Sequence, residues 1–142
     1  MTDRTDASPD AASGAVDDEA LVHALDRLHA MVAARKGGDP EASYTARLLA
    51  RGTPKIAQKL GEEAVEAVIE AVRADAARRG GAGGESESAA ATDALVEESA
   101  DMLYHLTVLW AALDVDPDRV WRALDARRGR GGLDEKKARK GG

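Results

Sequence analysis

The sequence predicts an all-α protein, a helical bundle of about four to five helices. Of its 142 residues 44% are hydrophobic, yet phenylalanine is absent and aromatic residues make up only 3%. Alanine, leucine and valine must therefore build the core, which is typical of helices, and β-branched and aromatic runs are too few for a sheet. Because an Ala-rich core is small for one protomer, we expect homodimerisation to complete the bundle.

Composition also excludes several classes of protein. The chain has no cysteine, so disulfides and thiolate metal sites are excluded, and a reducing cytoplasm is the expected compartment. The N-terminus is acidic, and no apolar run reaches membrane-spanning length, so we expect neither a signal peptide nor a membrane partner. The net charge of −6 argues against general nucleic-acid affinity.

Three segments lack hydrophobic periodicity. Residues 1–16 are expected to be a disordered leader, and residues 131–142 a basic, disordered tail. Residues 17–130 between them form the predicted all-α domain. Within it, the Gly-rich stretch 80–91 is expected to be a flexible loop.

Start and stop signals place the helices in order. The first follows an aspartate cap at 17 or 18 and ends near Lys36, before two glycines. A short helix follows Ser43 and closes at Gly52. In this short helix two interpretations stand nearly even: an ordinary connector, or a segment from which Ser43, Tyr44 and Arg47 reach a ligand.

The third, fourth and fifth helices are also marked by caps. Thr53 as N-cap and Pro54 at the first position start the third helix, which should run to about residue 79. Thr92 or Asp93 is expected to cap the fourth, which extends to about residue 113. An Asp-Pro pair at 116–117 then opens the last helix, through residue 127.

Charged groups gather on one arc of the third helix, opposite a broad apolar side. Glu66 follows Glu62 by four residues and Glu63 by three, spacings at which helical side chains meet. Lys55 and Lys59 lie one turn apart near the helix N-terminus and suit phosphates. Taken alone, a solvated face with Lys59 paired to Glu63 explains this arc as well as a metal site does.

The fourth helix favours the metal interpretation. It is apolar on nearly every side, and Glu98, Asp101 and His105 share one narrow strip of it. A buried carboxylate is costly unless it is paired or bound to a cation. Oxygen ligands favour Mg²⁺ or Mn²⁺. A diiron bundle would instead need Glu-x-x-His pairs, and here the histidine follows Asp101 by four residues.

These residues resemble a known family. The pattern Glu-Glu-x-x-Glu at 62–66, followed by Glu-x-x-Asp at 98–101, is similar to that of the all-α (MazG-like) nucleotide pyrophosphohydrolase superfamily. Within it, the chain resembles the phosphoribosyl-ATP pyrophosphatase family of histidine biosynthesis from about residue 21 to 131. The resemblance is carried by Ser43-Tyr44-Thr45, Lys55-x-x-Gln58-Lys59-x-Gly61-Glu62-Glu63 and Asp101-x-x-Tyr104-His105.

The resemblance implies Mg²⁺-dependent hydrolysis of phosphoribosyl-ATP to phosphoribosyl-AMP and pyrophosphate by a cytoplasmic homodimer. It also implies roles for individual residues. The metal ligands would be Glu63, Glu66, Glu98 and Asp101, with Glu62 as an outer-sphere group or base. The phosphate contacts would be Lys55, Gln58 and Lys59. Further substrate contacts would be Ser43, Tyr44 and Arg47. For Tyr104 and His105 the resemblance allows contact with the substrate, packing, or orientation of a carboxylate.

Two alternatives remain open. One is a housekeeping pyrophosphatase of the same superfamily that acts on nucleoside or deoxynucleoside triphosphates, which the carboxylate set does not distinguish. The other is a non-catalytic helical dimerisation module whose acidic faces are solvated. The first predicts preference for a deoxynucleotide over phosphoribosyl-ATP, and the second predicts no saturable Mg²⁺ binding.

Overall fold

A computed structural model of the protein describes residues 18–80 and 83–128. The described part contains helices and no strand, which confirms the all-α prediction, and within it no helix is long and apolar enough to cross a membrane. The predicted leader (1–16) and basic tail (131–142) lie outside the described residues. In chain order the helices are α1 (Asp18–Ala33), α2 (Tyr44–Arg51), α3 (Thr53–Arg78), α4 (Gly84–Ala112) and α5 (Pro117–Arg128).

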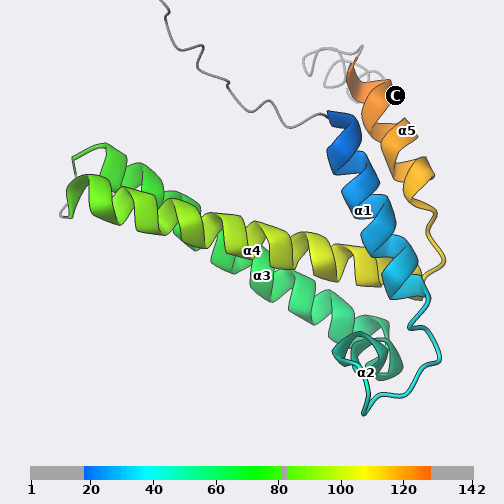
Figure 1. Ribbon diagram of the computed structural model, residues 1–142. Helices are drawn as coiled ribbons and strands as arrows, with labels where there is room; N and C mark the ends of the chain where they lie inside the picture. The colour runs from blue at the N-terminus through cyan, green and yellow to red at the C-terminus, as the bar shows by residue number, and fades with distance from the viewer. Residues whose placement is uncertain (1–17, 81–82, 129–142) are drawn as a thin grey trace, which may run out of the picture.

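The dominant feature is a long antiparallel hairpin formed by α3 and α4 (Figure 1). At one end of this hairpin, α1 packs against α4, and α2 packs against the beginning of α3. α5 runs beside α1 at the same end (Figure 1). The other end of the hairpin projects away from these three helices, so one half of the long pair is covered and the other half is not.

α2 and α3 meet at a single shared residue. Gly52 closes α2 and also precedes the first residue of α3, with a φ of 86° that is rare for other residues. The predicted N-cap role of Thr53 is therefore wrong: Thr53 is the first residue of α3, and no side chain caps this end. The predicted cap at Ser43 is present, because its hydroxyl accepts a hydrogen bond from the Ala46 amide.

α4 begins earlier than the sequence indicated. The stretch predicted to be a flexible loop, 80–91, is helical from Gly84 onward. Alanine is the best helix former, and two glutamates in the first turn favour the positive end of the helix dipole, so local propensity outweighs the glycines. Thr92 is consequently interior rather than a cap, and its hydroxyl donates to the Ser88 carbonyl at 2.7 Å.

The hydrophobic core sits where the four helices α1 to α4 converge. Ile56, Val32 and Val108 are fully buried there, one from each of three helices. α5 is tied to this end through Trp121, whose indole N–H donates to the Asp26 carboxylate at 3.1 Å. The same ring meets Trp110 of α4 edge-on at a centroid distance of 5.8 Å. This end of the hairpin therefore contains the core and the contacts that fix α3 and α4 relative to the other helices.

Further along the hairpin, the side of α3 that faces α4 is not its most apolar side. Small buried residues, Ala74 and Ala77 on α3 and Ala91 on α4, let the two helices approach closely. The larger aliphatic side chains point the other way and are 51–64% exposed. We call this exposed row the α3 strip: Val65, Val68, Ile69 and Val72.

The α3 strip shows that the broad apolar side of this helix is not uniformly buried. Val68 and Val72 within it are more than 60% exposed. At 100° per residue the strip lies opposite Glu63 and Ala74, which face α4. Carboxylates therefore occupy the inter-helix side of α3, and the valines occupy its outer side.

Candidate metal centre

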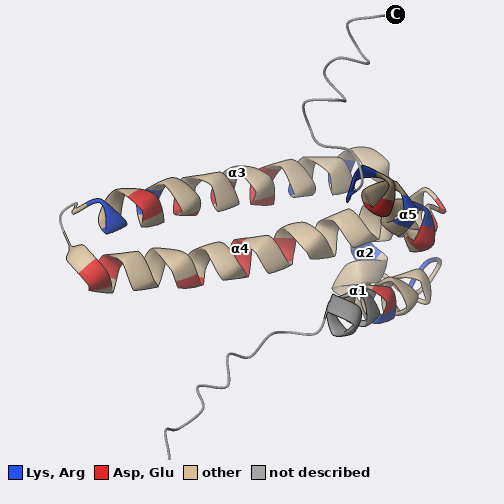
Figure 2. Cartoon of the chain, turned by 90° about the horizontal axis from the view of Figure 1, so that it is seen from above, with Lys and Arg blue, Asp and Glu red and all other residues tan. Residues whose placement is uncertain are grey.

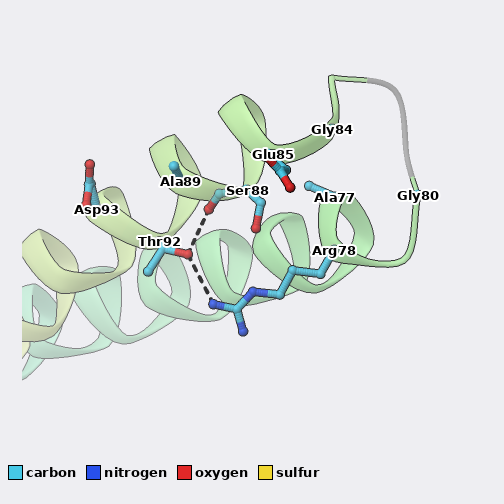
Figure 3. A pocket seen from close by; sticks show the side chains of 9 residues that line it. All are labelled: Ala77, Arg78, Gly80, Gly84, Glu85, Ser88, Ala89, Thr92 and Asp93. Carbon is cyan, nitrogen blue, oxygen red and sulfur yellow. Dashed lines mark hydrogen bonds between the residues drawn. The ribbon is translucent and has the colours of Figure 1, made fainter. Parts of the chain in front are cut away.

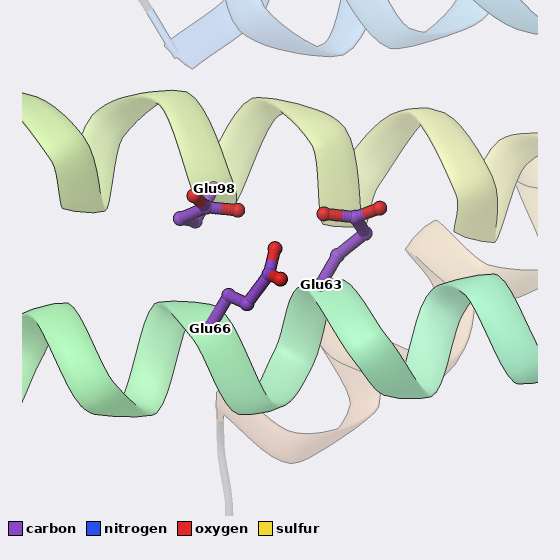
Figure 4. Close-up of side chains that lie close together, drawn as sticks. All are labelled: Glu63, Glu66 and Glu98. Carbon is purple, nitrogen blue, oxygen red and sulfur yellow. The ribbon is translucent and has the colours of Figure 1, made fainter.

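Three carboxylates meet between α3 and α4 (Figure 4). Glu63 and Glu66 come from successive turns of α3, and Glu98 comes from the facing turn of α4. One oxygen of each lies within 4.8 Å of the others. Acidic residues recur along both helices of the hairpin (Figure 2). We call Glu63, Glu66 and Glu98 the carboxylate triad.

The triad combines partial burial with like charge. Glu63 is only 8% exposed, Glu98 is partly buried, and Glu66 is exposed. Loss of hydration raises the pKa of Glu98 above its ordinary value, and the neighbouring charge of Glu66 raises it further. Carboxylates crowded in this way repel one another unless a cation lies among them. Because all three donors are oxygens, the set suits a hard divalent ion such as Mg²⁺ or Mn²⁺.

The raised pKa of Glu98 predicts a pH-dependent stability in metal-free protein. The Glu98 carboxyl binds its proton more tightly in the folded chain than in the unfolded chain. The free energy of unfolding therefore falls as the pH rises from the ordinary glutamate pKa of 4.5 through the raised pKa. We expect Glu98→Gln to melt at a higher temperature than wild type at pH 7 in EDTA. That difference should shrink toward zero as the pH falls to 4.5. A difference that grows on acidification would contradict the assignment; thermal melts of both proteins across this range decide.

A polar chain runs along the edge of α3 and ends at the triad. The Lys55 ammonium donates to the Gln58 amide oxygen at 3.2 Å, and the Gln58 amide N–H donates to Glu62 at 2.8 Å. Lys59 donates to the other oxygen of Glu62 at 2.8 Å and lies 3.5 Å from Glu63 Oε1. The Lys59 contact lowers the pKa of Glu62, and the reciprocal bond raises the pKa of Lys59. Four of the predicted residues are thus joined to the triad.

Asp101 occupies a different position from the one expected for a ligand. It is one turn beyond Glu98 on α4, and its charge contributes to the raised pKa of Glu98. Its side chain is exposed, however, and its carboxylate is outside the group whose oxygens lie within 4.8 Å. Its role as a fourth ligand therefore stays a prediction.

His105 is buried beside the triad. Its Nδ1 lies 2.8 Å from the Asp101 carbonyl oxygen, and because that oxygen only accepts, Nδ1 carries the hydrogen. The same nitrogen is 3.9 Å from Glu63 Oε1. The ring is 5% exposed, and Nε2 has no hydrogen-bond partner among the described residues. A side chain so enclosed lies beside Glu63 and leaves little surface for a substrate to contact.

Tyr104 links the triad region to α2. Its hydroxyl shares a 2.6 Å hydrogen bond with Thr45, and burial raises its pKa. Tyr44 stacks on the Tyr104 ring at a centroid distance of 6.5 Å and stays 54% exposed. Of the two tyrosines, Tyr44 is therefore the more exposed, and Tyr104 packs against it.

The other α2 residues have structural partners. Ser43 caps its own helix, and the Arg47 side chain donates to the Pro40 carbonyl at 3.1 Å. The structure also gives Thr45 a contact in this region. In the sequence, Thr45 belongs to the Ser43-Tyr44-Thr45 motif, but no role was predicted for it. Its partner, Tyr104, is 59 residues away, so no local pattern indicated the contact.

A separate groove lies at the far end of the hairpin, between the end of α3 and the beginning of α4 (Figure 3). It has a volume of about 700 Å³ and contains none of the predicted site residues. Arg78 crosses it to Thr92 at 3.5 Å. Cationic, acidic and hydroxyl groups are mixed along its lining, so its charge favours no particular ligand.

Comparison with known proteins finds similar chains along most of this sequence. The model of the family described as phosphoribosyl-ATP pyrophosphohydrolase matches residues 25–128, which include the triad and the α2 residues. A phosphoribosyl-ATP pyrophosphatase of Azospirillum brasilense is 53% identical over 124 residues, covering 87% of this chain and 97% of the relative. Proteins of the same name from Paramagnetospirillum magneticum and Paracoccus denitrificans are 51% and 50% identical, covering 81% and 82% of this chain and 91% and 93% of the relatives.

Proposed function

Because the chain belongs to the phosphoribosyl-ATP pyrophosphohydrolase family, a family of hydrolases, we propose that it hydrolyses phosphoribosyl-ATP to phosphoribosyl-AMP and pyrophosphate with Mg²⁺. We place this activity in histidine biosynthesis, in the cytoplasm. The observation that carries the proposal is the carboxylate triad, in which two helices bring three acidic oxygens within 4.8 Å. Crowding of this kind is favourable only when a cation is bound.

In this proposal the triad holds the metal, and Asp101, one turn from Glu98, completes the set. A divalent ion bound there supplies charge neutralisation at a polyphosphate and lowers the pKa of a bound water. The chain's own groups do the rest. Lys55, Lys59 and Gln58 lie along the edge of α3 and present two cations and an amide to phosphate oxygens. Glu62, held between Gln58 and Lys59 with a lowered pKa, stays ionised, which suits an outer-sphere group that orients these two side chains better than a general base.

The experiment that tests the proposal is a turnover assay of phosphoribosyl-ATP with and without Mg²⁺, beside a panel of nucleoside and deoxynucleoside triphosphates. We expect pyrophosphate release from phosphoribosyl-ATP that requires the metal. Preference for a triphosphate from the panel would favour the housekeeping pyrophosphatase instead. Absence of both turnover and saturable Mg²⁺ binding would favour the non-catalytic helical module.

We propose that the protein works as a homodimer. The support is the α3 strip, whose four aliphatic side chains are each more than half exposed and lie on the outer face of the hairpin. Two residues of α4, Val96 and Leu103, are also exposed, at 61% and 38%. Contiguous exposed apolar surface of this kind marks protein–protein interaction sites. In a two-fold dimer, the α3 strip of one hairpin would pack against the α3 strip of the other.

We propose further that Tyr44 stacks on the adenine ring of the substrate. Stacking of a base on an aromatic side chain is worth about 1–3 kcal/mol, so Tyr44→Ala should raise KM about tenfold. The value of kcat should change little, because stacking on the base contributes equally to the bound substrate and to the transition state. Tyr44→Phe, which keeps the ring, should retain the wild-type KM. Steady-state kinetics of the three proteins decide, and an unchanged KM in Tyr44→Ala would remove Tyr44 from the substrate site.

A further inference from the structure

Lys59 occupies an unusual place beside the carboxylate triad. Its ammonium group lies 3.5 Å from Glu63 Oε1 and 2.8 Å from Glu62 Oε2, and its side chain is 29% exposed. Among the described ion pairs it provides the one lysine or arginine contact to the triad. Lys55, on the previous turn, contacts Gln58 instead. One cation is therefore already placed where a second, divalent cation would have to approach.

We propose that Lys59 competes with the divalent cation for Glu63, so that metal uptake turns its ammonium group away from the carboxylates and toward the substrate phosphates. The inference rests on the proposed function, because it assumes that the triad binds a metal. It assigns Lys59 a role that differs from that of a simple phosphate contact: Lys59 sets the affinity of the triad for the metal.

The direction of this effect follows from charge. A lysine that neutralises Glu63 lowers the attraction of the triad for an incoming ion and repels that ion directly. A phosphate that engages Lys59 removes this competition, so phosphate and metal should each strengthen the binding of the other. The partial exposure of Lys59 limits the size of both effects, since solvent screens its charge.

The test is a calorimetric titration of Mn²⁺ into wild type, Lys59→Met and Lys59→Arg, each with and without inorganic phosphate. Protein-free titrations correct for Mn²⁺ bound by phosphate in solution. We expect Lys59→Met to bind Mn²⁺ about three- to tenfold more tightly than wild type, because a competing charge is gone. Lys59→Arg keeps the charge and should stay within about twofold of wild type. Phosphate should tighten Mn²⁺ binding to wild type more than to Lys59→Met, because only wild type has the lysine that phosphate draws away from Glu63.

Arg79→Met is the matched control. It removes an exposed cation from the C-terminal end of the same helix, where Arg79 pairs with Asp75, and should leave Mn²⁺ affinity unchanged. Circular dichroism melts establish that each variant folds, and Lys59→Gln replaces Lys59→Met if that protein does not.

The outcomes separate the two proposals. Wild-type protein that binds no Mn²⁺ overturns the metal site and, with it, the role of Lys59. If wild type binds Mn²⁺ and Lys59→Met binds it with equal or weaker affinity, only the competition proposal is overturned. A lysine that merely supported the local structure would lower the Mn²⁺ affinity when it is removed.

Discussion

Glu66→Gln is expected to abolish pyrophosphate release while the fold is retained or slightly stabilised. In the proposed mechanism, loss of one ligand would weaken a metal site worth several kcal/mol of transition-state stabilisation, so turnover should fall about 10³-fold. Without metal, the same change removes one of three like charges within 4.8 Å of each other, so the melting temperature in EDTA should rise by about 1–3 °C. Pyrophosphate release and thermal melts provide the two measurements.

The control for this substitution is Asp75→Asn. It makes the same change of charge on the same helix, at an exposed residue that pairs with Arg79, and should alter neither quantity. Near-wild-type turnover in Glu66→Gln would refute the metal assignment. Asp101→Asn asks a narrower question: we expect it to be inactive as well, and full activity would remove Asp101 from the ligand set while leaving the triad in place.

Ile69→Asp is expected to convert a dimer into a monomer. The residue lies within the α3 strip and is 51% exposed in the single chain. A two-fold interface would contain the substitution twice, and each carboxylate taken out of water costs several kcal/mol, more than most interfaces tolerate. Sedimentation equilibrium at micromolar concentration should show the molecular mass fall by half relative to wild type.

Leu124→Asp is the control for this experiment. Leu124 is 50% exposed but belongs to α5, away from the α3 strip, so the same kind of substitution there should leave the mass unchanged. A wild-type protein that is monomeric at this concentration, or an Ile69→Asp variant that stays dimeric, would show that the α3 strip is not the interface.

The helical architecture could be predicted because its determinants are local. Alanine-rich composition and caps such as Ser43 and Gly52 act within a few residues, and the helices they predicted are present. One error arose where two local signals conflicted. Glycines at 80–84 favoured a loop through residue 91, while the alanines and glutamates that follow favoured a helix, and the helix formed from Gly84.

The site could be predicted in part, because carboxylates at helical spacing are visible in any sequence. That Glu63 and Glu66 would meet Glu98 required the hairpin to close in one register, and only the packed helices establish it. The separation of Asp101 from this group, the enclosure of His105 and the contact between Thr45 and Tyr104 depend on the same packing.

By itself, the sequence determined that this protein is helical, which residues carry the carboxylates and cations, and which family it resembles, because side-chain chemistry and turn-by-turn spacing are properties of the local chain. The tertiary structure decided which side of each helix is buried. Small alanines allow α3 and α4 to approach closely, so Glu63 was buried between the helices and the valines were left outside. That choice depends on contacts between residues tens of positions apart, which no local pattern contains.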